Sequence, residues 1–398
     1  MSELSYLEKL LDGVEVEWVT LGSMADIGTG SSNRQDESEN GIYPFYVRSK
    51  NILKSDTFEF DEVAIVIPGE GGIGDIFHYV EGKYALHQRA YRIRITTNAV
   101  DTKFLYYFMS SSFKQYILTK SVGATAISIR KPMLEGFKVP IPSPDNPEKS
   151  LAIQSEIVRI LDKFTALTAE LTAELTAELT MRKKQYNHYR DLLLSFKEGE
   201  VEWKALKEVS DIYDSLHQTP QYSKNGLSMI RVTDIKNGYI DLKNTLKVND
   251  GIFSIFTKKY LPQKNDLVMS RVGSYGNVGI IPTDNSACMG QNTVVIHPHI
   301  NNRYLFYILT SSIGQDFIEK NVGGGSQKTL SLKSIKSIPI PLTGESEQSK
   351  IVSILDKFDT LTTSISEGLP REIELRQKQY EYYRDLLFSF PRPETASN

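Results

Sequence analysis

The sequence predicts an α+β fold with two similar α+β domains, which are separated by two long antiparallel helices and related by an internal pseudo-two-fold duplication. Three observations carry this prediction. Motifs in the first half of the chain return about 190 positions later. Each half holds short apolar runs divided by Gly, Asn, Ser and Asp, which is typical of strands and turns. The segment after each half shows apolar residues at helical spacing.

The repeat extends over most of the 398 residues. Its paired segments are Val16–Trp18 with Val201–Trp203, Phe104–Tyr107 with Tyr304–Tyr307, Val139–Pro142 with Ile338–Pro341, Ile160–Phe164 with Ile354–Phe358, and Lys184–Leu193 with Lys378–Leu387. Solenoid units are only about 20–50 residues long, so this period indicates that a whole domain and its following helix are duplicated. A duplicated chain offers two similar faces to a partner with approximate two-fold symmetry.

The repeat and the composition divide the chain into six segments. They are an N-terminal segment at 1–13, a first domain at 14–147, a central helix at 148–197, a second domain at 198–343, a C-terminal helix at 344–390 and a disordered tail at 391–398. Tyr6–Leu11 resembles the Tyr189–Leu193 segment that precedes the second domain. We therefore expect the N-terminal segment to dock beside the C-terminal helix.

The two domains are expected to contain the same elements in the same order. Strands are predicted at 16–18, 62–67, 76–80 and 90–95 in the first domain, and at 201–203, 267–269 and 293–296 in the second. Helical spacing of apolar residues predicts one helix over 104–120 and one over 304–320. A glycine-rich turn and a strand that ends in Pro-X-Pro follow each helix.

The segments after the Pro-X-Pro motifs predict two long helices. Residues 148–196 contain no Gly or Pro, so they predict one continuous helix of about 70 Å. The C-terminal counterpart contains Gly368 and Pro370, and we expect a break near 366–370. Two helices with apolar stripes are expected to pack on each other as in a coiled coil.

The first long helix contains the unit Thr-Ala-Glu-Leu three times, over 168–179. Each unit turns about 400°, so the stripe formed by Leu171, Leu175 and Leu179 drifts by about 40° per unit. Alanine, leucine and glutamate are strong helix formers. The segment is either a plain helical spacer or a spacer whose length matters, since three units span about 18 Å, near five base-pair steps.

Composition excludes several classes of protein. The single cysteine, Cys288, rules out an internal disulfide framework and fits a reducing cytosol. The N-terminus lacks the pattern of a signal peptide and no stretch approaches a membrane span, so we expect a cytoplasmic protein without a membrane partner. The net charge of −3 argues against nonspecific coating of nucleic acid but allows local basic surfaces.

No motif supports catalysis by this chain. The six histidines show no metal-ligand spacing, and P-loop, Gly-x-Ser-x-Gly and methyltransferase Pro-Pro motifs are absent. Gly69–Gly74 satisfies G-x-G-x-x-G, but a dinucleotide site needs a helix directly after it, where the sequence predicts a strand. The counterpart Gly273–Gly279 also lies between predicted strands. Both segments are interpreted as tight turns or as loops whose backbone approaches DNA phosphate.

Several motifs together resemble the specificity (S) subunit of Type I restriction-modification systems. They are the two Pro-X-Pro segments, the helix openings with Gln154 and Glu347-Gln348, the two Ile-Leu-Asp-Lys-Phe runs, the paired Lys-Gln-Tyr and Tyr-Arg-Asp-Leu-Leu ends, and the Thr-Ala-Glu-Leu repeat. The resemblance covers essentially the whole chain. It is closest to a subfamily in which such repeats separate two DNA-reading domains.

The resemblance implies two target-recognition domains, each of which reads one half of a split, asymmetric DNA site. It also implies partners: two modification (M) subunits that dock on the helices and use S-adenosylmethionine for adenine N6 methylation, and restriction (R) subunits that use ATP and Mg. No cofactor is expected in this chain. Because the two domains are less alike than the helices, we expect two different half-sites with centres about 10 bp apart.

The candidates for DNA contact are basic and polar side chains near the glycine-rich loops and after the domain helices. Arginine can pair with guanine and Asn or Gln with adenine, whereas lysine mostly meets phosphate. The first domain offers Arg48, Lys50, Gln88, Arg89, Lys120, Ser121 and Thr125. The second offers Arg231, Lys236, Arg271, Tyr275, Gln291, Asn292, Lys320, Ser326, Gln327 and Lys328. Each of them could instead be an ordinary solvated residue.

Tyr186, Tyr189, Tyr380 and Tyr383 lie in helix motifs that are the same in both halves. We therefore expect a shared role for them, either pairing of the helices or docking of M. Two other functions stay open at this point. A coiled-coil scaffold would bind proteins only, and an enzyme would bind a nucleotide through the glycine-rich loop.

Overall fold

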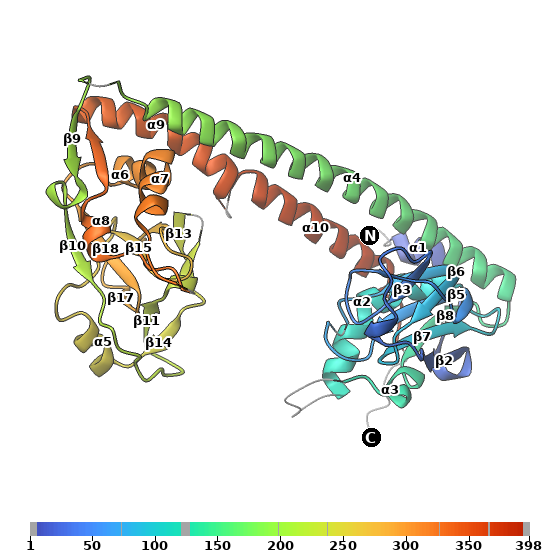
Figure 1. The fold of residues 1–398 in the computed structure, drawn as a ribbon. Helices are drawn as coiled ribbons and strands as arrows, with labels where there is room; N and C mark the ends of the chain where they lie inside the picture. The colour runs from blue at the N-terminus through green and yellow to red at the C-terminus, as the bar shows by residue number, and fades with distance from the viewer. Residues whose placement is uncertain are drawn as a thin grey trace. The chain divides into compact units, whose positions relative to one another are not determined.

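The computed structural model describes residues 6–72, 74–120, 128–197, 199–236, 238–325, 327–364 and 367–392. The chain forms two compact units, Met1–Thr172 with Leu375–Asn398, and Ala173–Glu374. Each unit combines a domain of mixed helix and sheet with parts of the long helices (Figure 1). Among the described helices, none has both the length and the apolar character that are needed to cross a membrane.

The first unit contains one main sheet, covered by a helix. Its strands are β1 (Val16–Thr20), β2 (Ala25–Thr29), β3 (Tyr43–Tyr46), β4 (Leu53–Ser55), β5 (Phe60–Pro68), β6 (His78–Leu86), β7 (Ala90–Ile95) and β8 (Lys138–Pro142). Its helices are α1 (Tyr6–Leu11), α2 (Thr102–Lys120), α3 (Lys131–Glu135) and the beginning of α4 (Pro147–Leu193). The sheet has the order β2-β7-β5-β6-β3-β4, in which β3 and β6 are parallel, and β1 pairs with β8.

The second unit repeats this plan with more divided strands. Its strands are β9 (Glu202–Ala205), β10 (Ser210–Asp214), β11 (Leu227–Ile230), β12 (Ile235–Lys236), β13 (Gly238–Ile240), β14 (Leu246–Val248), β15 (Leu267–Ser270), β16 (Val278–Ile280), β17 (Ala287–Met289), β18 (Thr293–Pro298) and β19 (Pro339–Leu342). Its helices are α5 (Asp250–Phe256), α6 (Asn302–Thr310), α7 (Ser312–Asn321), α8 (Leu332–Lys336), α9 (Glu345–Thr363) and the beginning of α10 (Gly368–Leu387). The order β10-β18-β15-β16 corresponds to β2-β7-β5-β6, and β19 pairs with β9 as β8 pairs with β1.

The expected strands at 62–67, 90–95, 267–269 and 293–296 are confirmed as β5, β7, β15 and β18, and the strand expected at 76–80 begins two residues later as part of β6. The helix predicted over 104–120 is confirmed as α2. The single helix predicted over 304–320 is wrong, because α6 and α7 meet at Ser311, whose backbone is extended. A Cβ at Gly314 would lie 2.6 Å from the carbonyl oxygen of Leu309, so glycine permits this sharp junction. Apolar spacing does not reveal the break, because both helices contribute residues to the same core.

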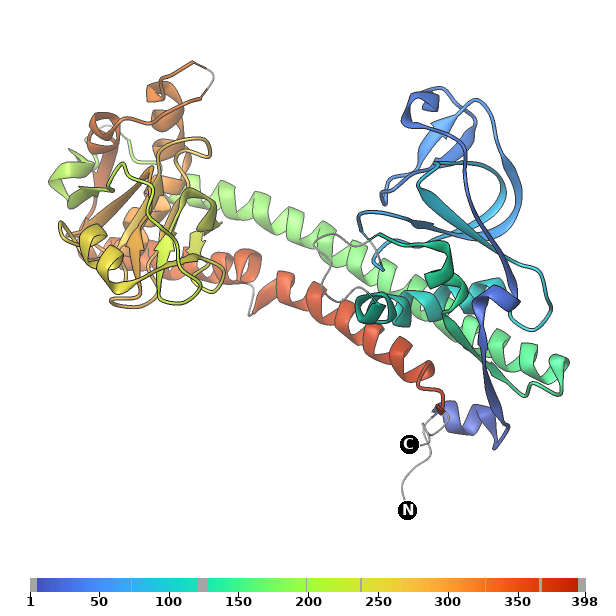
Figure 2. The same cartoon turned by 90° about the horizontal axis from the view of Figure 1, so that it is seen from below.

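The core of the first unit joins segments from both ends of the chain. Phe104 and Phe108 of α2 contact the ring of Phe388, with centroids 5.6 and 5.5 Å apart. Leu7 and Leu11 of α1 belong to the same core, and both ribbon views place α1 beside the end of α10 (Figures 1 and 2). The sheet, α2 and α4 supply further members, which include Ile65, Ile93, Phe113, Ile153, Ile157 and Leu161.

The disordered tail was predicted over residues 391–398, but Pro391 and Arg392 contact the first domain. The indole N–H of Trp18 donates a hydrogen bond of 2.8 Å to the carbonyl of Pro391, and the Arg392 guanidinium lies 5.6 Å from the centre of the Trp18 ring. These contacts tie Pro391 and Arg392 to the domain. Residues 393–398 lie outside the described part of the chain.

The long helices agree with the distribution of Gly and Pro in the sequence. Helix α4 continues without interruption from Pro147 to Leu193. The C-terminal segment is divided near the expected place, since α9 ends at Thr363 and α10 begins at Gly368. Gly368 has a φ of 79°, and a Cβ there would lie 2.5 Å from the carbonyl oxygen of Thr360, so this turn requires glycine. Pro370 lies in the first turn of α10, where a missing N–H removes no helical hydrogen bond.

Each unit pairs α4 with a different C-terminal helix through the same contact. In the first unit, Phe164 of α4 stacks on Tyr383 of α10, with centroids 5.6 Å apart. In the second unit, Tyr189 of α4 stacks on Phe358 of α9, also at 5.6 Å. Phe164 and Phe358 occupy the same place in the repeat, and so do Tyr189 and Tyr383. The repeated motifs therefore form similar helix pairs. In the first pair α4 supplies the phenylalanine and the C-terminal helix supplies the tyrosine, and in the second pair this is reversed.

Candidate nucleic-acid interface

The glycine-rich loop of the first domain begins at a point where three segments meet. The N–H of Gly69, at the end of β5, donates to the carbonyl of Arg89 at 2.9 Å, and the carbonyl of Gly69 accepts from Ile129 at 2.8 Å. The N–H of His87, after β6, donates to the carbonyl of Tyr46 at 2.9 Å. We call this arrangement the first junction. It fixes the backbone from which the loop side chains project.

The second domain contains the same backbone arrangement. The N–H of Arg271 donates to the carbonyl of Asn292, and its carbonyl accepts from Leu330, both at 2.8 Å. The N–H of Gly290 donates to the carbonyl of Ile230 at 2.8 Å. We call this the second junction. The two junctions thus share their hydrogen bonds but carry different side chains.

The loop after each junction connects strands. Gly71, Gly72 and Gly74 have positive φ values. Between Pro68 and His78, of which all residues except 73 are described, no helix begins. The helix that a dinucleotide site would need is therefore not found in this described segment, and the loop is a turn.

Two of the predicted DNA contacts in the first domain, Arg48 and Arg89, meet at Glu70. Nη1 of Arg48 and Nη1 of Arg89 both donate to Oε2 of Glu70, at 3.0 and 3.2 Å. Gln88 is next to Arg89, and its amide donates to Oδ1 of Asn33 at 2.5 Å. The side chains of Arg48, Glu70 and Arg89 are 43%, 44% and 56% exposed, so they line a surface that a polyanion can reach.

His87 lies under this group and is almost fully buried. Burial lowers the pKa of its imidazole, and the charges of Arg48 and Arg89 lower it further. The buried ring is therefore expected to be neutral and to support the loop rather than to contact phosphate.

In the second domain, Tyr275 and Lys328 meet around Glu319 of α7. The Tyr275 hydroxyl donates to Oε2 of Glu319 at 2.7 Å, and the Lys328 ammonium lies 3.2 Å from Oε1. The hydrogen bond from Tyr275 and then the ammonium of Lys328 hold the pKa of Glu319 below its usual range. Lys328 is adjacent to the second junction, because its carbonyl accepts from the N–H of Gly273 at 3.4 Å.

Arg271, a predicted DNA contact, is largely shielded from solvent. Its side chain is only 12% exposed, and its guanidinium is bonded to Asp214 at 2.6 Å and to the carbonyl of Leu330 at 3.1 Å. Arg271 therefore supports the second junction from inside. Arg231 is more accessible, with 35% exposure, but both ends of its guanidinium are bound to Asp234 at 3.1 Å.

The other predicted contacts are not all brought together. Gln291 and Asn292 are half-buried beside the second junction, at the place that Gln88 and Arg89 occupy in the first. Lys120 turns back over the ring of Tyr116 at 5.6 Å. Lys50, Lys236, Lys320 and Gln327 are exposed on separate segments, whereas Ser121, Thr125 and Ser326 lie outside the described residues.

Sequence reasoning missed Glu70 and Glu319. A search for side chains that bind DNA favours cations and amides, so it passes over carboxylates. The position of Glu70 among glycines was the available signal, since a charged residue in such a loop is presented to solvent. Glu319 gave no comparable signal, because acidic residues on a helix surface are common.

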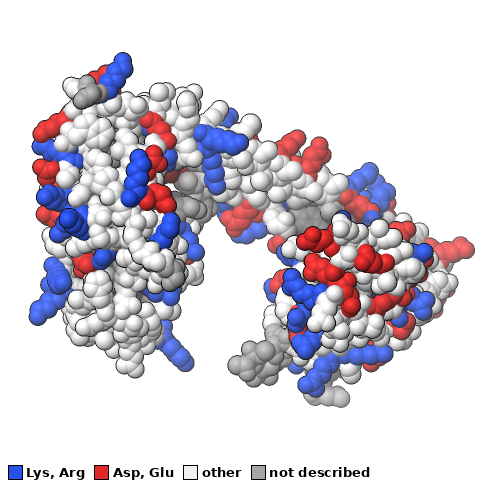
Figure 3. Space-filling view, in the orientation of Figure 1, with Lys and Arg blue, Asp and Glu red and all other residues white. Residues whose placement is uncertain are grey.

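Charge on the surface is mixed rather than concentrated. In Figure 3, acidic and basic side chains are interspersed over the face of each unit that is shown. Among the described residues, no group of three or more His, Cys, Asp and Glu side chains could hold a metal ion. The charged groups at the two junctions are thus local features of a protein whose net charge is −3.

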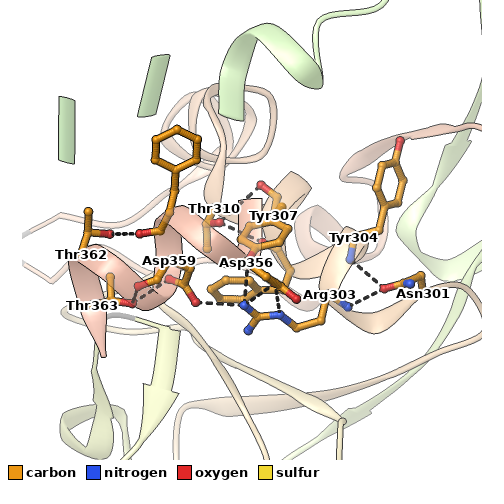
Figure 4. A network of polar contacts seen from close by, with 11 residues as sticks. Asn301, Arg303, Tyr304, Tyr307, Thr310, Asp356, Asp359, Thr362 and Thr363 are labelled. Carbon is orange, nitrogen blue, oxygen red and sulfur yellow. Dashed lines mark hydrogen bonds and ion pairs between the residues drawn. The ribbon is translucent and has the colours of Figure 1, made fainter. Parts of the chain in front are cut away.

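Polar contacts anchor each domain to its long helix. In the second unit, Arg303 of α6 reaches α9, where Nε lies 2.9 Å from Asp356 and Nη2 lies 2.9 Å from Asp359 (Figure 4). The hydroxyl of Tyr307 donates to Asp356, and burial raises the pKa of this tyrosine strongly.

The first unit has the corresponding anchor between α2 and α4. The ammonium of Lys103 and the hydroxyl of Tyr107 contact Asp162 at 2.8 and 2.7 Å. Asp162 and Asp356 occupy the same place in the repeat. Equivalent carboxylates therefore orient both domains on their helices.

The four helix tyrosines differ in accessibility. Tyr186 is only 8% exposed and packs against Tyr307, so it serves the second core and is not an external docking residue. The Tyr380 hydroxyl lies 3.1 Å from Thr165, which joins α10 to α4. Tyr189 and Tyr383 are 43% and 38% exposed despite their stacking, so contact with a partner remains a prediction for them.

Comparison with known proteins gives a consistent result. The family described as Type I restriction modification DNA specificity domain matches residues 13–181 and 198–375. The specificity subunit of the type I restriction enzyme EcoR124I/EcoR124II from Escherichia coli is 39% identical over 420 aligned positions, which cover 100% of both chains. The EcoprrI specificity subunit from Escherichia coli is 34% identical, over 92% of this chain and 93% of its own length. A solved chain from a study of complex assembly and conformational transition of the type I R-M system aligns over 94% of this chain and 97% of its own, with a TM-score of 0.55 and 15% identity, which supports the fold.

Proposed function

Because this chain belongs to the Type I restriction-modification DNA specificity family, we propose that its two junctions are the surfaces by which it recognises DNA. The chain is a DNA-recognition subunit and not itself the enzyme. Sequence-directed methylation or cleavage by the complex then depends on which DNA the junctions accept.

One observation carries this proposal: the junctions share a backbone but differ in side chains. Gln88 and Gln291 are alike, but Arg89 in the first junction corresponds to Asn292 in the second. Arginine favours guanine, whereas Asn and Gln favour adenine. The two domains therefore read different half-sites, and the complete site is split and asymmetric.

The long helices supply the spacing between the half-sites. Helix α4 has 47 residues, and the half-buried Leu171, Leu175 and Leu179 lie near its middle. Antiparallel packing of the C-terminal helices along α4, as in a coiled coil, makes a stiff spacer. We propose that the chain belongs to the subfamily in which the number of Thr-Ala-Glu-Leu units sets the gap, and the three units in α4 support this.

Two M subunits dock on equivalent surfaces of the repeat. Leu192 and Leu386 occupy the same place in the repeat and are 58% and 36% exposed, close to Tyr189 and Tyr383. Apolar and aromatic side chains of this kind favour a protein partner. S-adenosylmethionine is bound by M, and ATP and Mg are bound by R.

Genome-wide mapping of adenine methylation tests this function, in cells that express the chain with its matching M subunit. The expected result is one split motif with a fixed gap. If M is bound but no motif appears, the chain is a protein scaffold and the proposal is wrong. A bound nucleotide in native mass spectra of the chain would instead support the enzyme alternative.

A further inference from the structure

We infer that Glu70 and Glu319 determine specificity, because each holds proposed DNA-contacting side chains of its junction and competes with phosphate for them. This inference rests on the proposed function and identifies how a recognition domain rejects wrong DNA. The two carboxylates are thus specificity-determining residues of the proposed recognition step.

The first junction shows the competition directly. Arg48 and Arg89 come from different segments, yet they converge on one oxygen, Oε2 of Glu70. The backbone of Glu70 is fixed, because it follows the buried Gly69 and pairs with Ser128. A guanidinium has five N–H donors, and in the described residues each of these arginines uses one nitrogen on Glu70. Both arginine side chains are about half exposed, at 43% and 56%, so nucleic acid can reach them.

The second junction reaches the same result from a different element. The position equivalent to Glu70 is Val272, which pairs with Thr329 as Glu70 pairs with Ser128. The carboxylate that contacts Tyr275 and Lys328 comes instead from Glu319 of α7. Carboxylates that were merely retained from the duplication would lie at equivalent positions in the two domains. The recurrence from a different element points to a function of the carboxylate itself.

The chemistry favours rejection of wrong DNA. Phosphate from any sequence must displace the carboxylate from its cations, and the displaced carboxylate then lies unpaired beside other phosphates. A correct half-site offers a partner to the displaced carboxylate, since the exocyclic amine of cytosine or adenine can donate to it. Glu70 and Glu319 therefore weaken binding to incorrect DNA more than binding to correct DNA.

The test uses the full chain in complex with M and DNA duplexes that contain the mapped site. In one duplex the first half-site is scrambled, and in another the second half-site is scrambled. The variants are Glu70→Gln, Glu319→Gln and, as a control, Glu135→Gln. Glu135 is as exposed as Glu70, at 44%, and also forms an ion pair, but with Lys131 of its own helix. Binding is measured by titration at several salt concentrations.

Each variant should discriminate less well against one scrambled half-site and should discriminate against the other as before. We expect Glu70→Gln to raise affinity for one scrambled duplex about 2- to 30-fold, as for removal of two half-exposed ion pairs. The salt dependence for that duplex should become steeper by about 0.9 per new phosphate contact. Glu319→Gln should act on the other duplex, while Glu135→Gln should change neither. For each variant, retained binding of the correct duplex and retained discrimination at the half-site that it leaves unchanged show that the chain is folded.

Two results would overturn the inference. Glu70→Gln and Glu319→Gln could behave like Glu135→Gln, or either variant could relax both half-sites equally, which would be a general charge effect. If the unaltered complex itself does not distinguish scrambled from correct DNA, the proposed function fails rather than this inference alone.

Discussion

The role of the residues directly after α10 in the first unit can be tested at Phe388. Its ring is 6% exposed and contacts Phe104 and Phe108, so Phe388→Ala removes a core aromatic group. Truncation of a buried phenylalanine lowers the free energy of unfolding by about 3–5 kcal/mol. We expect a fall of about 3 kcal/mol for the first unit, because the end of α10 can partly collapse into the space. With an m-value of about 2–3 kcal/mol/M, the urea midpoint of the first unit should fall by about 1–1.5 M.

Tryptophan fluorescence makes this measurement specific to one unit. Trp18 lies in the first unit, 6.0 Å from Phe108, so in a Trp203→Phe background its emission reports that unit alone. Leu386→Ala is the control, because Leu386 is 36% exposed on the same helix and should shift the midpoint by less than about 0.5 M. An equal shift for the two variants, or none for Phe388→Ala, would refute the assignment of α10 to the first core.

Three further outcomes are expected. Burial raises the pKa of the Cys288 thiol to about 12, so iodoacetamide should not alkylate it at pH 8 until the second unit unfolds, and rapid labelling of the native chain would contradict its position. Asp356→Ala removes the shared acceptor of Arg303 and Tyr307, so the free energy of unfolding of the second unit should fall by about 1–2 kcal/mol. Labelling of Cys288 at increasing urea concentration measures this fall. The control Asp250→Ala, at the exposed start of a helix, should lower the same free energy by less. Deletion of Thr172–Leu175 shortens α4 by about 6 Å, so methylation mapping should return the same half-sites with a gap shorter by one or two base pairs, and altered half-sites would exclude the spacer role.

Local patterns in the sequence were sufficient to predict several elements. The continuity of α4 and the break before α10 depend on where Gly and Pro occur, and both can be read from neighbouring residues. The break between α6 and α7 could not be predicted, since Ser311 and Gly314 interrupt the backbone without interrupting the apolar spacing. Backbone turns of this kind depend on contacts that a hydrophobicity pattern does not contain.

The candidate site was predictable only in part, because it depends on distant residues. The sequence indicated Arg48, Gln88 and Arg89, and the sheet order brings the two arginines together at Glu70, whereas Gln88 bonds to Asn33. The inward contacts of Arg271 could not be predicted, since its partner Asp214 lies 57 positions away in the chain. A basic residue beside a glycine-rich loop can contact DNA or support the loop, and only its exposure and its partners distinguish the two roles.

The arrangement of contacts explains how two similar domains can recognise different DNA. The helix pairs and the carboxylate anchors are equivalent in the two units, since Asp162 and Asp356 each bind a tyrosine of the domain helix. These contacts restrict how each domain is mounted, so their residues cannot change freely. The junctions are restricted in a different way, because their hydrogen bonds use backbone atoms. Side chains there can change without loss of the frame, and even the position of the carboxylate has changed between Glu70 and Glu319. Recognition can therefore diverge while the surfaces that serve the partner subunits stay alike.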